Sequence, residues 1–168
     1  MIGEKNDSDQ KEIMEKMKNI IINAAKYYDQ VFVDLKKETK YSEQTEILNM
    51  SDIIVFNVEQ KFQTIENVFE NEEFQKHRNK VIWNICKYDR NSKYNIKNLS
   101  RTILKKQTIC QTNYNTQVFD TTQEGNLPEL LLKFRTIRED EENVQFINNM
   151  KKLSEEIILR YQNIRSGI

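Results

Sequence analysis

The feature that most constrains this chain is the alternation of short apolar runs with amphipathic stretches. Four runs predict β-strands: Val31–Leu35, Ile53–Val58, Val81–Cys86 and Thr108–Thr112. The run at 53–56 is continuous rather than alternating, which is typical of strands covered on both faces. Segments with apolar residues at spacings of three and four separate the runs and predict helices. Strands that alternate with helices favour right-handed crossovers and a parallel sheet.

We therefore expect an α/β fold with three layers, in which a mostly parallel sheet of about four strands carries helices on both faces. A chain of 168 residues fits one domain, spanning residues 1–168. The polar residues 1–9 are expected to be disordered. The segment 113–125 is expected to be a polar loop. The pattern predicts helices over about 10–28, 42–49, 62–74, 94–104, 127–137 and 144–164.

Composition excludes several classes of protein. The 26 basic and 26 acidic residues cancel, so no overall field attracts the chain to nucleic acid or anionic lipid. No run approaches the ~18 apolar residues of a membrane span, and the N-terminus lacks a signal peptide's apolar core, so we expect a cytoplasmic location. Cys86 and Cys110 are predicted to be reduced thiols within strands. His77 is predicted to lie on the surface.

Four polar residues at or beyond predicted strands are candidates for a ligand site. Asp34 ends the first strand run, where it could bind magnesium or orient water, or simply cap a loop. Asn84 could hydrogen-bond an adenine edge or neighbouring backbone. Lys87 and Asp89 follow the third run and would face the same crevice at the sheet's carboxyl edge.

A second candidate site is a local basic patch within the segment 87–106. Its central residues are Arg90, Lys93, Lys97 and Arg101, with Lys87, Lys105, Lys106 and the aromatic residues Tyr88 and Tyr94 alongside. Cations interleaved with aromatic rings could contact nucleic acid or an acidic partner. A solvated helix face explains the same pattern without any ligand.

The order of these motifs resembles the C-terminal part of the MinD/ParA family of deviant P-loop ATPases. Residues 28–35 are similar to the family's Walker B segment, and residues 51–55 to its following strand. Residues 81–89 are similar to the strand whose Asn contacts adenine, and 113–125 to the late loop that closes over the nucleotide. Lys87–Lys93 and Tyr114–Thr116 favour the CpaE/TadZ branch, whose members localise pilus secretion machinery. The resemblance implies a nucleotide-binding remnant at Asp34, Asn84, Lys87, Asp89 and Asn115.

The chain departs from this family at the phosphate-binding loop. No glycine occurs between Gly3 and Gly125, so no glycine-rich loop can supply backbone N–H groups to a triphosphate. Without that loop, nothing neutralises the phosphates or positions the attacking water in line, and these two effects supply most of the catalysis in phosphoryl transfer. We therefore expect no ATPase activity from this chain alone. In the family, the strand before the phosphate-binding loop lies between the Walker B strand and the strand that follows it. If that strand is absent here, a slot would remain between residues 31–35 and residues 53–58. In a complete gene product we expect residues 31–35 to close that slot; in a fragment, the missing N-terminal half would fill it.

These observations lead to three hypotheses for function. The first is a non-catalytic ParA/MinD-like domain that acts through protein–protein contacts or self-association and positions pilus, secretion or partition machinery. The second is the C-terminal portion of a true ATPase, which would bind ATP and magnesium only if another segment supplied the P-loop. The third is a nucleic-acid-binding module that uses the basic patch. No cofactor or metal ligand set is predicted.

Overall fold

The structure of the chain is a computed structural model, which describes residues 7–35, 41–136 and 141–167. The chain divides into two compact units, Met1–Ser51 and Asp52–Ile168, and each is described by itself. Among the described residues, all of the β-structure belongs to the second unit.

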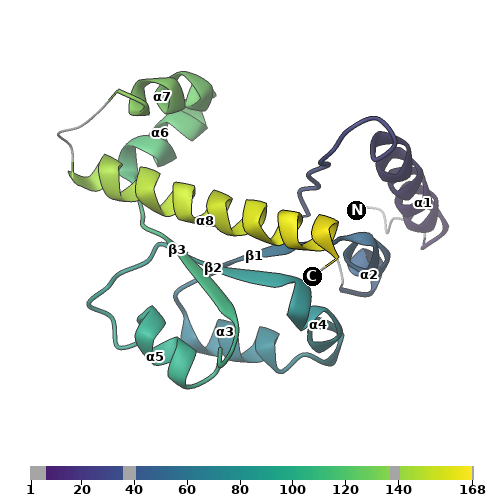
Figure 1. Ribbon diagram of the computed structural model, residues 1–168, viewed down its shortest axis with the longest axis horizontal. Helices are drawn as coiled ribbons and strands as arrows, with labels where there is room; N and C mark the ends of the chain where they lie inside the picture. Colours follow the sequence, from purple (N-terminus) through teal and green to yellow (C-terminus); the bar gives the residue numbers. More distant parts are fainter. Residues whose placement is uncertain (1–6, 36–40, 137–140, 168) are drawn as a thin grey trace, which may run out of the picture. The chain divides into compact units, whose positions relative to one another are not determined.

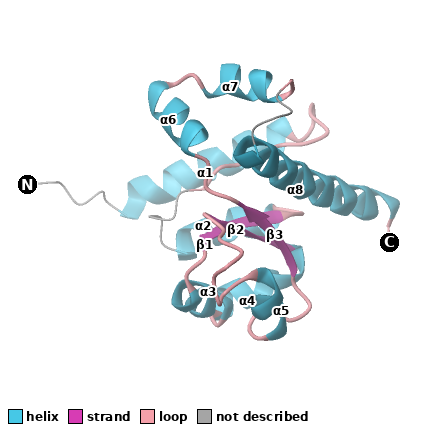
Figure 2. Ribbon diagram, turned by 90° about the vertical axis from the view of Figure 1, so that its left-hand side faces the viewer, coloured by secondary structure: helices cyan, strands magenta, loops and turns pink. Residues whose placement is uncertain are grey.

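The second unit is built on a parallel sheet of three strands, β1 (Ile54–Glu59), β2 (Val81–Cys86) and β3 (Thr108–Thr112), in that order. Three of the four predicted strands are thereby confirmed. Helices lie on both sides of the sheet, with α8 on one side and α3, α4 and α5 on the other (Figures 1 and 2). The α/β architecture is as expected, although the described sheet has three strands instead of about four.

One face of the sheet is closed by aromatic side chains. Phe56 and Trp83 are register partners on β1 and β2, and their rings lie 5.3 Å apart. Phe74 packs on both rings, at 5.5 Å and 5.1 Å, and Phe69 lies 6.3 Å from Trp83. Trp83 is fully buried. Side chains alternate between the faces of a strand, so this aromatic cluster defines the face of the sheet that α3 and α4 cover.

The helices on the aromatic face are shorter than the sequence predicts. They are α3 (Phe62–Phe69), α4 (Glu72–His77), the 3-10 turn η1 (Arg78–Lys80) and α5 (Ile96–Arg101). The helix expected over 62–74 is broken because Asn71 caps α4 by accepting a hydrogen bond from Phe74 N. His77, the last residue of α4, is buried, not on the surface as expected.

The chain after β3 forms α6 (Thr116–Glu124), α7 (Leu127–Phe134) and α8 (Glu141–Ser166), of which α8 packs on β3 and α7 packs on α8. The predicted loop over 113–125 is therefore largely a helix. Two residues explain the difference: Asn115 caps its start, and Gly125 ends it with a φ of 77°, in the left-handed region that favours glycine. The final helix is longer than the expected 144–164. Ile137 falls outside the described residues.

The first unit contains α1 (Asp7–Ala24) and α2 (Tyr41–Met50). An exposed ion pair joins them, with Lys18 Nζ 3.2 Å from Glu46 Oε2. Residues 7–9 belong to α1 and so are not disordered as expected, and α1 ends earlier than the predicted residue 28. Residues 1–6 lie outside the described ranges.

The predicted strand at Val31–Leu35 is wrong, because these residues form no regular secondary structure. Phe32 is 78% exposed. A strand exists only where a neighbour pairs with its backbone, and an apolar run by itself does not supply that neighbour. In the described part of the chain, β1 pairs with β2 alone, and residues 31–35 supply no strand for the slot expected beside it.

Candidate functional site

The carboxyl end of the sheet carries a row of hydrogen-bonded polar side chains. Asn84, on β2, is 4% exposed, and it lies between its neighbours on β1 and β3. Its Nδ2 donates to Asn57 Oδ1 at 2.8 Å, and its Oδ1 accepts from Thr112 Oγ1 at 3.0 Å. Both ends of this amide are engaged by side chains of the sheet. The geometry therefore gives Asn84 a cross-strand role, in place of the backbone contact considered from sequence.

An ion-pair cluster follows this row. Glu59 ends β1 and accepts from Lys61 Nζ at 2.5 Å and from Lys87 Nζ at 2.7 Å. These two ammonium groups, Lys61 first, lower the pKa of Glu59 to about 2. Glu59 in turn raises the pKa of Lys87, which leaves β2 with a φ of 51°. Burial raises the pKa of the neighbouring Cys86 thiol, so this sulfur is protonated at neutral pH and is a weak nucleophile.

The loop after β2 is held by the side chain of Gln60. Its Nε2 donates to the carbonyls of Asp89 and Tyr94, both at 3.0 Å, and its Oε1 accepts from Asp89 N at 2.7 Å. The Asp89 carboxylate accepts from Asn91 N at 2.8 Å. Both the backbone and the side chain of Asp89 therefore have a structural role in this turn.

The remaining predicted remnant residues have local partners or lie in the other unit. Asn115 is 4% exposed; it accepts from Val118 N at 2.8 Å and donates to Asn143 Oδ1 on α8 at 2.7 Å. This residue caps α6 and attaches α8. Asp34 is exposed in the segment 31–35 of the first unit. Asn84 lies within β2, and Lys87 and Asp89 follow its carboxyl end, each with partners of its own.

The basic patch is exposed to solvent. The segment 87–106 holds seven basic residues against one acidic residue, Asp89. Arg90, Lys97 and Arg101 are exposed, and within the described part of the chain they form no ion pair. Lys93 Nζ lies 4.9 Å from the ring centroid of Tyr94, which also packs on Phe62 at 5.1 Å. Because Lys93 and Phe62 already contact the Tyr94 ring, this ring is not free to stack on a base. The patch can therefore act mainly through its positive charge.

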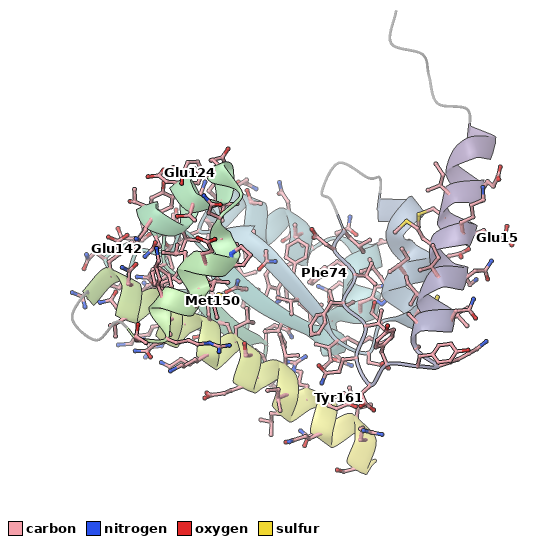
Figure 3. The ribbon with its side chains drawn as sticks, turned by 90° about the horizontal axis from the view of Figure 1, so that it is seen from above. Glu15, Phe74, Glu124, Glu142, Met150 and Tyr161 are labelled. Carbon is pink, nitrogen blue, oxygen red and sulfur yellow. The ribbon has the colours of Figure 1, made fainter. Side chains whose placement is uncertain are left out.

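A groove between α7 and α8 was not predicted from sequence. Its volume is about 750 Å³, within the range of ligand and peptide pockets. Leu131 and Phe134 line one side of the groove, and α8 supplies the floor with Val144, Ile147 and Ile158 among others. Phe134 lies 6.4 Å from Phe146, which fixes α7 beside the first half of α8. Figure 3 shows α8 running from Glu142 near its start to Tyr161 near its end, past α6 and α7.

The groove escaped prediction because α8 carries two overlapping apolar stripes. One stripe includes Leu153 and Ile157, and Leu153 is buried. The second stripe lines the groove and is interrupted by Lys151, Ser154 and Glu155, which hide its period. Its signal is the set of apolar residues at 144, 147 and 158, spaced as one helix face over about four turns.

No described helix is long and apolar enough to cross a membrane. In the same residues, no group of three or more His, Cys, Asp or Glu side chains is placed to hold a metal ion. Comparison of the chain with protein-family models, with curated proteins and with solved structures found no match.

Proposed function

We propose that this chain is a non-catalytic α/β domain that acts by binding protein, through the groove between α7 and α8. The single observation that supports the proposal is the exposure of large apolar side chains along that groove. Leu131 is 45% exposed, Met150 39% and Ile158 48%. Contiguous apolar surface of this kind marks interaction sites in soluble domains.

The shape of the groove favours a helical ligand. One face of α8 forms the floor from Val144 to Ile158, and α7 forms a wall beside only part of it. An open, elongated apolar channel along a helix suits another amphipathic helix, which would place side chains at spacings of three and four into it. The charged side chains of Arg135, Lys151 and Glu155, which also line the groove, would then determine the direction in which the bound helix lies.

The resemblance to MinD/ParA proteins adds the narrower hypothesis that the bound protein belongs to pilus, secretion or partition machinery. The groove does not depend on that resemblance. Residues 31–35, which carry its Walker B segment, form no strand, so we base the proposal on α7 and α8 alone.

A selection for helical peptides tests the proposal. A displayed library of amphipathic helices is panned against the wild-type chain, and binders are then titrated against Ile158→Glu, whose charge would lie in the groove. We expect enriched helices that lose at least ~10-fold in affinity, or about 1.4 kcal/mol, for the variant. Failure to enrich any helix, or equal affinity for the folded variant, would refute the proposal.

The non-catalytic part has its own test, in which the pure chain is incubated with ATP and magnesium and phosphate release is measured beside equilibrium dialysis. We expect no turnover. Measurable hydrolysis that scales with the concentration of the chain would remove this part of the proposal and favour the second hypothesis.

A second candidate function is supported by the unpaired cations of the basic patch. Exposed cations without acidic partners release counterions from a phosphate backbone when they bind it. The test is a gel shift with single-stranded and duplex oligonucleotides across a salt series. Charge reversal of Arg90, Lys93 and Lys97 together is expected to abolish the shift, whereas reversal of Lys26, Lys133 and Lys152, which changes net charge equally, is not. If the chain shifts no oligonucleotide even at low salt, nucleic-acid binding by the basic patch is ruled out.

A further inference from the structure

We infer that the occupant of the α7–α8 groove is a second copy of this chain, bound by antiparallel pairing of the two α8 helices. The inference rests on the proposed function, because it names the protein that the groove binds. It follows from the order of charges and apolar residues along the groove-lining face of α8.

The first step concerns two charged residues in the middle of that face. Lys151 and Glu155 both line the groove and are both exposed. They are four residues apart, yet neither forms an ion pair in the described part of the chain. The order Lys then Glu is the weaker arrangement for a pair within one helix. The face therefore presents one positive and one negative group, each free to meet a partner on another helix.

The second step is the symmetry of these charges. In a two-fold interface the same surface of both subunits meets, so residue i contacts j and j contacts i. An axis that crosses α8 at the level of Leu153, midway between the two charges, places Lys151 opposite the second copy's Glu155. The same operation places Glu155 opposite the second copy's Lys151. A single register therefore satisfies both charges twice, whereas a parallel pairing in register would set like charges against each other.

The third step is the apolar part of the face. The same axis brings Ile147 within one residue, or roughly 1.5 Å of helix rise, of the second copy's Ile158. Ser154 lies near the axis, where its small side chain lets the helices approach. The α7 wall stands beside Phe146, so Leu131 and Phe134 flank the position of the second copy's Ile158. The apolar ends and the charged centre thus agree on one register.

The expected assembly is a weak dimer. The pairing face is a single helix face of about four turns. We expect it to bury less than the roughly 800 Å² per partner of a standard interface. Sedimentation velocity of the full chain, from low micromolar to near-millimolar concentration, should show a monomer that converts to a dimer as concentration rises. A chain that stays monomeric at every concentration overturns the inference of a dimer. The proposed function would still be decided by the selection of helical peptides.

Charge-reversed variants test the register itself. Lys151→Glu and Glu155→Lys should each lower self-association at least ~10-fold, because each places like charges opposite one another twice. An equimolar mixture of the two variants should recover dimer, since every opposed pair is again of opposite charge. The double variant K151E/E155K should also dimerise. Lys133→Glu, on α7 outside the groove lining, changes net charge as Lys151→Glu does and should dimerise like the wild type.

All three substituted positions, Lys133, Lys151 and Glu155, are exposed, so each variant should fold, and circular dichroism and thermal melts check that it does. If the mixture stays monomeric while the double variant and the wild type dimerise, or if neither single variant weakens the dimer, the antiparallel α8 pairing is wrong. A dimer that Lys133→Glu disrupts as strongly as Lys151→Glu would equally overturn it, since net charge alone would then govern association.

Discussion

The two faces of the sheet are built from the same strands but close in different ways. Toward α3 and α4, Phe56, Trp83 and Phe74 form an aromatic cluster in which Trp83 and Phe74 are almost completely buried. On the opposite face, β1 and β2 each carry one amide, and Asn84 hydrogen-bonds Asn57 on β1 and Thr112 on β3. The aromatic face buries its central side chains inside the unit.

The α8 side is attached by polar contacts. Asn115 donates to Asn143, and Asn149 Nδ2 donates to Asn113 Oδ1 at 2.7 Å, so amides hold α8 to the segment after β3. At the other end, Arg160 donates to Thr108 Oγ1 at 2.5 Å. These polar contacts, together with the buried Leu153, position α8 and leave its groove-lining apolar stripe open. The comparison explains how one small unit can have both a closed core and an open apolar groove.

The largest expected effect comes from removing the centre of the closed face. Trp83→Ala should lower the free energy of unfolding by about 4 kcal/mol, because it leaves a cavity among Phe56, Phe69 and Phe74. Urea denaturation followed by circular dichroism measures it. The Trp83 indole N–H has no hydrogen-bond partner among the described residues, so Trp83→Phe should cost much less. Equal costs for both variants would contradict the aromatic-core account.

A smaller effect should follow from loosening the polar attachment of α8. Asn115→Ala removes both the cap of α6 and the bond to Asn143, for a loss of about 2 kcal/mol in unfolding free energy. Asn115→Ser keeps a capping oxygen but cannot donate in the same way to Asn143, so it should cost about half as much. Denaturant titration of both variants measures the difference. A serine variant as unstable as the alanine variant would show that capping contributes nothing.

The open groove should tolerate substitution. Ile158→Glu is expected to change the unfolding free energy by no more than about 0.5 kcal/mol, because the side chain is already 48% exposed. Thermal melts at a concentration where the chain is monomeric check this. A loss comparable to that of Trp83→Ala would mean that Ile158 belongs to the core and that the groove is not a free surface.

The smallest effect concerns the charges at the end of β1. The folded pKa of Glu59, about 2, is below its ordinary value of 4.5. Its contribution to stability is therefore fully present above pH 4.5 and is lost as pH falls through 2. Replacing Lys61 and Lys87 by Met should return the pKa of Glu59 toward 4.5. NMR titration of the carboxyl carbon measures it, and an unchanged midpoint near pH 2 would rule out these two lysines as the cause.

The three strands of the sheet could be predicted from the sequence. The absence of a strand at residues 31–35 and the presence of helix α6 could not. The strands at 54–59, 81–86 and 108–112 agree with the predicted runs to within one residue, because their apolar composition reflects burial in the sheet. Residues 31–35 look the same in sequence but have no sheet partner, which composition does not reveal. The helix α6 was missed because its caps, Asn115 and Gly125, lie within polar sequence.

The candidate site divides in the same way. The position of Asn84 at the centre of the sheet and of Lys87 and Asp89 beyond it was predictable from the strand run. Their partners were not, because Asn57, Glu59 and Gln60 become neighbours only through the register of β1 with β2. The groove required the relative placement of α7 and α8, which a single helical pattern does not contain.

The most direct test of the central claim, that the α7–α8 groove binds protein, compares wild-type chain and Ile158→Glu in one titration with a helix selected against the wild type. We predict that the two proteins melt at the same temperature while the variant binds at least ~10-fold more weakly. Equal affinity of two equally stable proteins would contradict the claim.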